Sequence, residues 1–185
     1  MAESKIYRIQ VSNDYAVLAP LNQKVTDVVP IFNSRPLWNE WVSLNYEFQI
    51  VQRGKITKIP DISIVVGAGL AFRQALKDEI FPFYSDMFEF LPIQVAGESW
   101  FVLNCLSTTL AYDSHESIFY RSIEGQIFLI NYLIVNDASL LAREIFVIDD
   151  SNRSNIFVFP SFMDRVNNLG LKGVTFKEMG FLRAN

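Results

Sequence analysis

The chain has 185 residues, of which 50% are hydrophobic and 19% charged, a composition that excludes a disordered protein because disorder requires few apolar residues and many charges. The formal net charge of −4 and the lack of a Lys/Arg run argue against nucleic-acid binding, which depends on clustered positive charge. The single cysteine, Cys105, excludes an intramolecular disulfide, and its apolar neighbours predict a buried thiol.

Residues 1–55 are predicted to form a β-rich N-terminal part. Residues 5–11 alternate apolar and polar side chains, and residues 15–18 follow a polar turn, a pattern that favours a hairpin. Residues 41–51 alternate in the same way, as in a half-buried antiparallel strand. No apolar signal-peptide region is evident near Met1, and the longest apolar stretch is too short to cross a bilayer, so we expect a cytoplasmic protein without a membrane contact.

The middle of the chain predicts one helix among several strands. Residues 68–79 place apolar side chains at helical spacing, and Pro82 follows as a stop. A short helical turn is expected after Asp137, ending at Arg143. Strands are expected at residues 62–66, 88–95, 100–106, 126–135 and 145–148.

The closing run, residues 155–177, predicts strand, helix and strand. Ser161 and Asp164 resemble a capping box at the start of the helix, and Gly170 followed by Leu171 resembles a Schellman-type stop. The whole chain, residues 1–185, is therefore expected to be a single α+β domain. Its sheet would be mixed or largely antiparallel, with two or three short helices.

The densest polar cluster runs from Asp113 to Ser117 and contains the only histidine, His115. A catalytic interpretation would make His115 a base oriented by Asp113 or Glu116, with a serine as the nucleophile. No G-x-S-x-G elbow surrounds either serine, so an exposed loop or binding surface is the favoured interpretation. With one His and one Cys in the chain, we predict no metal site, no cofactor and no catalytic residue.

Two further segments are candidate contact surfaces. Trp38, Glu40 and Trp41 follow Pro36 closely. Tryptophans are enriched in interface hot spots, although core tryptophans are commoner. Because Asn39 and Glu40 mark this segment as partly exposed, core and interface are equally favoured here. Asp149 and Asp150 form either an acidic contact surface or a solvated loop.

From Phe90 onward the sequence resembles a known family through an ordered set of short motifs. Phe90 to Ile93 is similar to an (F/L)LPV-like strand, and Trp100 to Asn104 to a Y-x-L-N-like strand. Asp113 with Ser117 is similar to a D-x-x-x-S step. Glu144-Ile145-Phe146 is similar to an LFR-like start, with Val147 where Arg is often seen, and residues 170–176 are similar to a closing GLKGxxF.

The family that these motifs resemble is the eleventh group of immunity proteins in bacterial polymorphic toxin systems, a former domain of unknown function with a myxobacterial type member. The family-like core spans residues 60–177. The resemblance implies a protein that is not an enzyme and that neutralises a cognate antibacterial toxin, encoded next to it, by direct contact. Two alternatives stay open: an enzyme that reverses the toxin's modification, and an adaptor that loads a secreted effector.

Overall fold

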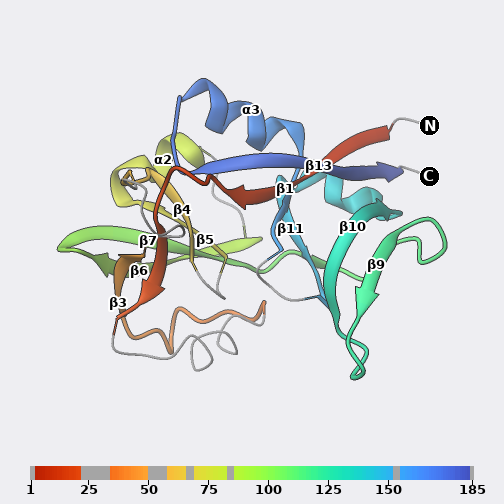
Figure 1. Cartoon of the computed structure of the whole chain (residues 1–185), viewed down its shortest axis with the longest axis horizontal. Helices are drawn as coiled ribbons and strands as arrows, with labels where there is room; N and C mark the ends of the chain where they lie inside the picture. The colour runs from red at the N-terminus through yellow and green to blue at the C-terminus, as the bar shows by residue number, and fades with distance from the viewer. Residues whose placement is uncertain are drawn as a thin grey trace.

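The computed structural model describes residues 3–21, 34–49, 58–65, 69–82, 86–151 and 155–183, and its fold is mostly β (Figure 1). Strands contain 51% of these residues and helices 14%. The α+β fold expected from the sequence is therefore wrong. Two β units account for the difference, a closed barrel and a seven-stranded sheet.

The first unit is a six-stranded barrel in the order β2-β3-β6-β7-β5-β4. Every strand contributes an apolar side chain to its core cluster, in which Trp100 and Tyr46 are the largest fully buried members. Burial of these alternate side chains supplies the free energy that closes the barrel. Its strands are β2 (Val17–Pro20), β3 (Asn45–Gln49), β4 (Ile62–Val65), β5 (Gly69–Arg73), β6 (Phe88–Val95) and β7 (Glu98–Cys105).

The second unit is a sheet in the order β8-β11-β12-β1-β13-β10-β9. The long strand β13 pairs antiparallel with β1 and parallel with β10. Gly180 makes the second pairing possible, because a Cβ at this position would lie 1.9 Å from the carbonyl oxygen of Leu133. The strands are β1 (Glu3–Val11), β8 (Thr108–Thr109), β9 (Ile118–Arg121), β10 (Ile127–Val135), β11 (Ile145–Ile148), β12 (Phe157–Val158) and β13 (Val174–Arg183).

One core cluster joins the two units. It contains Phe72 from the barrel, Val158 from the sheet and Phe162 from helix α3 (Pro160–Asn168), which lies over β1 (Figure 1). Arg165 fixes α3 by donating to both carboxylate oxygens of Glu144 and to the carbonyl of Ile80, 3.0 Å away. Ile80 ends α2 (Lys77–Ile80), which follows the short helix η2 (Gln74–Leu76), while η3 (Ala138–Ala142) covers the other face of the sheet.

The helix expected at residues 68–79 is the main error of the sequence-based prediction. Its first half contains strand β5, paired antiparallel with β4 and β7, and its second half, residues 74–79, is helical as expected. Ala71 faces the barrel interior while Leu70 and Phe72 face the shared core, so the segment is buried on both sides as a strand. Tertiary pairing overrides the helical spacing.

Two local predictions at the chain ends are also wrong. Residues 5–11 and 15–18 do not form a hairpin: β1 stays in the sheet, and the chain crosses to the barrel, where β2 pairs with β3 and β4. Ser161 does not cap α3, because Pro160 occupies the first turn and the helix begins after Phe159 without a side-chain cap.

Other predicted elements are confirmed. Strands β6, β7, β10 and β11 differ from their expected bounds by at most two residues at either end. The Asp137 side chain accepts a hydrogen bond from the Ser139 amide at the start of η3. The α3 stop has the expected form, with Gly170 at φ +67 and the Leu171 amide bonded to the Val166 carbonyl. Residues 50–51 and 152–154 of the predicted strand and loop lie outside the described residues.

Among the helices that the structure describes, none combines the length and the apolar character needed to cross a membrane.

Candidate protein-binding surfaces

The segment that carries Trp38, Glu40 and Trp41 is anchored on the barrel by a polar pair, the half-buried Glu89 and the buried Asn104. Glu89 and Asn104 stand opposite each other on β6 and β7. The Glu89 carboxylate accepts hydrogen bonds from the backbone amides of Leu37 at 2.7 Å and Trp38 at 3.2 Å. Asn104 donates to Glu89 at 2.9 Å and to the Arg35 carbonyl at 2.9 Å. These bonds fix the backbone immediately before and at Trp38.

The two tryptophans of this segment have different environments. Trp41 packs on the barrel core, and its indole Nε1 donates to the Pro92 carbonyl at 2.8 Å. The Trp38 side chain is 59% exposed although its backbone is held by Glu89. Glu40 is exposed and pairs with Arg35 at 3.4 Å. Trp41 therefore supports the segment, and Trp38 is the side chain that it presents to solvent.

The loop from Asp113 to Ser117 is held by its own polar side chains. Asp113 Oδ1 accepts from the backbone amides of His115 at 2.9 Å and Glu116 at 3.0 Å, and these two bonds, that of Glu116 first, lower the pKa of the Asp113 carboxyl. The buried Ser117 hydroxyl accepts from the Ile134 amide at 2.9 Å and donates to its carbonyl. Ser117 is thus bonded to strand β10 and not to His115, so the arrangement is not that of a nucleophile and its base.

The end of β13 completes the attachment of this loop. Arg183 donates two hydrogen bonds of 2.7 Å to the Glu116 carboxylate, and this contact lowers the pKa of Glu116. The Asp113 carboxylate lies 4.0 Å from the same guanidinium. The side chains of Ser114 and His115 are exposed, so these two residues of the loop are placed to contact another molecule.

Asp150 also has an internal role. Its Oδ2 accepts from the Tyr112 hydroxyl at 2.8 Å and from Arg121 at 2.8 Å, which ties β9 to the end of β11. Burial, followed by the bond to Asp150, raises the pKa of Tyr112. Asp149 is exposed, and its amide donates to the Thr109 carbonyl at 3.1 Å. The acidic pair is therefore divided, with Asp150 structural and Asp149 on the surface.

The structure brings two of the three predicted segments into one region. Tyr112, which binds Asp150, directly precedes the Asp113–Ser117 loop, and both are anchored on β9, β10 and β13. The Trp38 segment has a separate anchorage on β6 and β7 of the barrel. The sequence alone does not reveal this division, because Glu89 and Asn104 are far from Trp38 along the chain.

Sequence reasoning missed a third surface, on the β9–β10 hairpin. Ile118, Tyr120 and Phe128 are 54%, 52% and 57% exposed, and Ile123 at the turn is fully exposed at 107%. The available signal was the run Ile118-Phe119-Tyr120, in which Phe119 packs on the core and its two neighbours do not. Because polar residues flank this short edge strand on both sides, its sequence pattern is typical of a loop.

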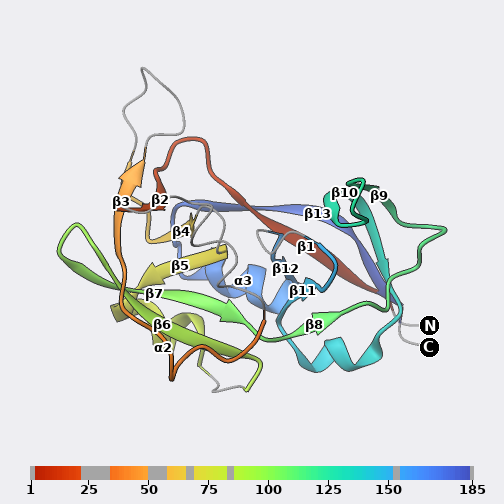
Figure 2. The ribbon, with the colours of Figure 1, turned by 90° about the horizontal axis from the view of Figure 1, so that it is seen from below.

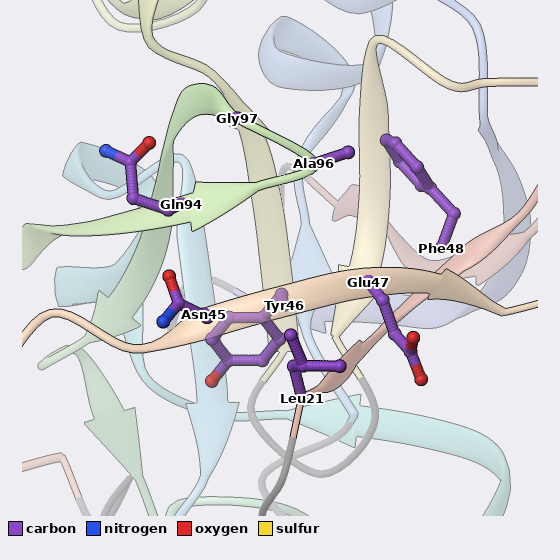
Figure 3. Close-up of a pocket in the computed structure, with 8 residues that line it drawn as sticks. All are labelled: Leu21, Asn45, Tyr46, Glu47, Phe48, Gln94, Ala96 and Gly97. Carbon is purple, nitrogen blue, oxygen red and sulfur yellow. The ribbon is translucent and has the colours of Figure 1, made fainter.

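A shallow pocket of about 240 Å³ lies beside β3 and the β6–β7 turn (Figure 3). This volume is below the roughly 300 to 1,000 Å³ of typical small-molecule sites. Its two titratable groups are Glu47 and Tyr46, and burial raises the pKa of Tyr46 to about 12, so this phenol stays neutral at pH 7. Among the described residues, no group of three or more His, Cys, Asp or Glu side chains is placed to hold a metal ion.

A comparison with protein-family models finds none that matches the chain, and a comparison with curated proteins finds no match either.

Proposed function

We propose that the protein is a cytoplasmic immunity protein, which binds a cognate antibacterial toxin encoded beside it and neutralises it by direct contact. The observation that carries the proposal is Trp38, a large side chain that is exposed while its backbone is fixed by Glu89. Trp is the residue most enriched in interface hot spots, and a preformed anchor loses little conformational entropy on binding.

The motifs behind the family resemblance support the same proposal because their described residues have structural tasks. Ser117 bonds to β10, and Asp113 holds its own loop. A Cβ on Gly173 would lie 1.9 Å from the Ile62 carbonyl oxygen, so the closing motif allows a close approach between β13 and β4. These residues therefore form a scaffold, and the toxin contacts that we propose lie elsewhere, at Trp38.

The proposed mechanism is steric. If Trp38 binds in a pocket of the toxin or at the rim of its active site, the toxin's substrate can no longer reach that active site. The immunity protein need not supply any reactive group. The exposed Arg35–Glu40 pair borders Trp38 and would form the polar rim of such an interface.

The test is to purify the protein with the toxin encoded next to it and to measure binding and growth protection. Trp38→Ala is expected to weaken binding by at least about 30-fold, the effect of removing a hot-spot residue. Val42→Ala is the matched control, because Val42 is 74% exposed in the same segment, and it should change affinity by no more than a few-fold.

Two outcomes would contradict the proposal. One is the absence of both a complex and growth protection. The other is loss of protection in His115→Ala while binding persists, since a reactive histidine would indicate an enzyme that reverses the toxin's effect. An adaptor that only loads an effector would bind the toxin without protecting cells that express it internally.

A further inference from the structure

The outer side of the β9–β10 hairpin carries five exposed apolar side chains, those of Ile118, Tyr120, Ile123, Phe128 and Leu129, which we call the hairpin face. Register places Tyr120 opposite Leu129, and the Tyr120 and Phe128 rings lie 6.4 Å apart, so the three side chains share one side of the sheet. Ile118 lies two residues from Tyr120 on the same side. Ile123 at the turn adds a fully exposed side chain. Phe119 and Ile130 point the other way, into the core.

The hairpin face is about as large as the largest apolar patches on monomeric proteins. The exposed fractions of Ile118, Tyr120, Ile123, Phe128 and Leu129 are 54%, 52%, 107%, 57% and 38%. Because a large side chain presents roughly 200 Å² when it is free, these five residues together expose on the order of 600 Å². This is the upper limit of the largest patch on a typical monomer, about 300 to 600 Å². It also approaches the roughly 800 Å² that each partner buries in a standard interface.

Most of the charged side chains around this hairpin are already matched within the chain, and the exposed Glu124 of the turn is the exception among the described residues. Arg121 pairs with Asp150 at 2.8 Å, Arg183 with Glu116 at 2.7 Å, and Lys5 with Glu178 at 2.8 Å. A charged partner would therefore find little to complement. A second copy of this chain fits better, because residues near a two-fold axis meet their own counterparts, where an unmatched charge would repel itself.

The hairpin is placed and braced for such a contact. β9 is the terminal strand of its sheet, and Figures 1 and 2 show β9 and β10 at one end of the molecule, away from the barrel strands. On the inner side, the Arg121 guanidinium lies 5.0 Å from the Phe119 ring centroid, which lies 5.3 Å from that of Tyr112. This packing fixes the hairpin before association, which lowers the entropic cost of pairing.

From these observations we infer that the protein forms a homodimer in which the hairpin faces of two copies pack together around a two-fold axis. This contact is independent of the Trp38 surface, which stays open in each protomer. Two such faces would bury about 1,200 Å² in total, the lower end of the standard interface size, so we expect a dissociation constant on the order of micromolar.

Sedimentation equilibrium on the full chain tests the inference. Between about 1 and 100 µM, the mass should approach twice the 21.2 kDa of the monomer. The double variant Tyr120→Lys/Phe128→Lys should raise the dissociation constant at least about 100-fold, because like charges would meet across the axis. Leu141→Lys, which adds one lysine at a side chain 51% exposed on η3, should leave the dimer intact.

Far-UV circular dichroism establishes that each variant is folded. Ile123→Ser provides a second test, because Ile123 is a fully exposed turn residue that does not contribute to the core, so its replacement should not affect folding. This variant should also weaken the dimer. A monomeric wild-type protein at the highest concentration would overturn the inference. The inference would also be overturned if Leu141→Lys dissociated the dimer as much as the double variant does. A third contradicting result would be that Tyr120→Lys loses toxin binding while Trp38→Ala still binds the toxin, since this would assign the hairpin face to the toxin.

Discussion

At the scale of single residues, Ser117 shows how a polar side chain in an exposed loop can be structural. Its buried hydroxyl replaces a strand partner by bonding to both the amide and the carbonyl of Ile134. Ser117→Ala leaves the Ile134 amide without this partner, while the Ile134 carbonyl keeps its bond from the Asp113 amide at 2.9 Å. An unmade buried hydrogen bond costs about 1 to 3 kcal/mol. We expect urea denaturation to show a loss of stability in that range.

Ser114→Ala is the control for this substitution, because Ser114 is exposed in the same loop. Its effect should stay within about 0.5 kcal/mol, as is usual for surface positions. Equal stability of the two variants would mean that the Ser117 hydroxyl does not hold the loop to β10.

At the scale of elements, the contact between the Asp113–Ser117 loop and β13 should depend on pH. Arg183 lowers the pKa of Glu116 below its ordinary value of 4.5. A carboxyl whose pKa is lower in the folded state stabilises the fold above its unfolded pKa, and this contribution disappears as the pH falls through the folded pKa. Wild type should therefore unfold at a higher temperature than Glu116→Gln above about pH 5, and the difference should shrink towards pH 3.

Thermal unfolding followed by circular dichroism across this pH range measures the difference. Glu124→Gln is the matched control, since it removes an exposed carboxylate from the nearby β9–β10 turn. A difference between wild type and Glu116→Gln that stays constant down to pH 3 would exclude the ionised Glu116 as its cause.

The same scale shows which parts of the fold and of the candidate sites were predictable. Strand β11 was predicted because its apolar run is continuous, and strand β6 because apolar residues recur along it up to the turn at Ala96 and Gly97. Strand β5 was not, since the spacing of Phe72, Leu76 and Ile80 fits a helix until β4 and β7 supply hydrogen-bond partners. Likewise, only the distant Glu89 distinguishes the presented Trp38 from the supporting Trp41.

At the scale of the whole molecule, the barrel and the sheet should unfold together because they share one core cluster. Phe72 is fully buried in it, with ring centroids of Phe81 and Phe90 at 5.2 and 5.8 Å. Phe72→Ala is expected to cost about 3 to 5 kcal/mol, as large-to-small core substitutions do. If the cluster couples the two units, this loss lowers the stability of both.

The three tryptophans of the chain, Trp38, Trp41 and Trp100, all lie in or on the barrel, so their fluorescence follows that unit, whereas far-UV circular dichroism follows both. In denaturant, the two signals should change in one coincident transition, and Phe72→Ala should shift both midpoints equally. Leu110→Ala, at a side chain 60% exposed, should change the free energy of unfolding obtained from either signal by no more than about 0.5 kcal/mol. A fluorescence transition that moves alone would mean that the barrel unfolds separately, since a shared core does not permit one half of the molecule to lose Phe72 without weakening the other.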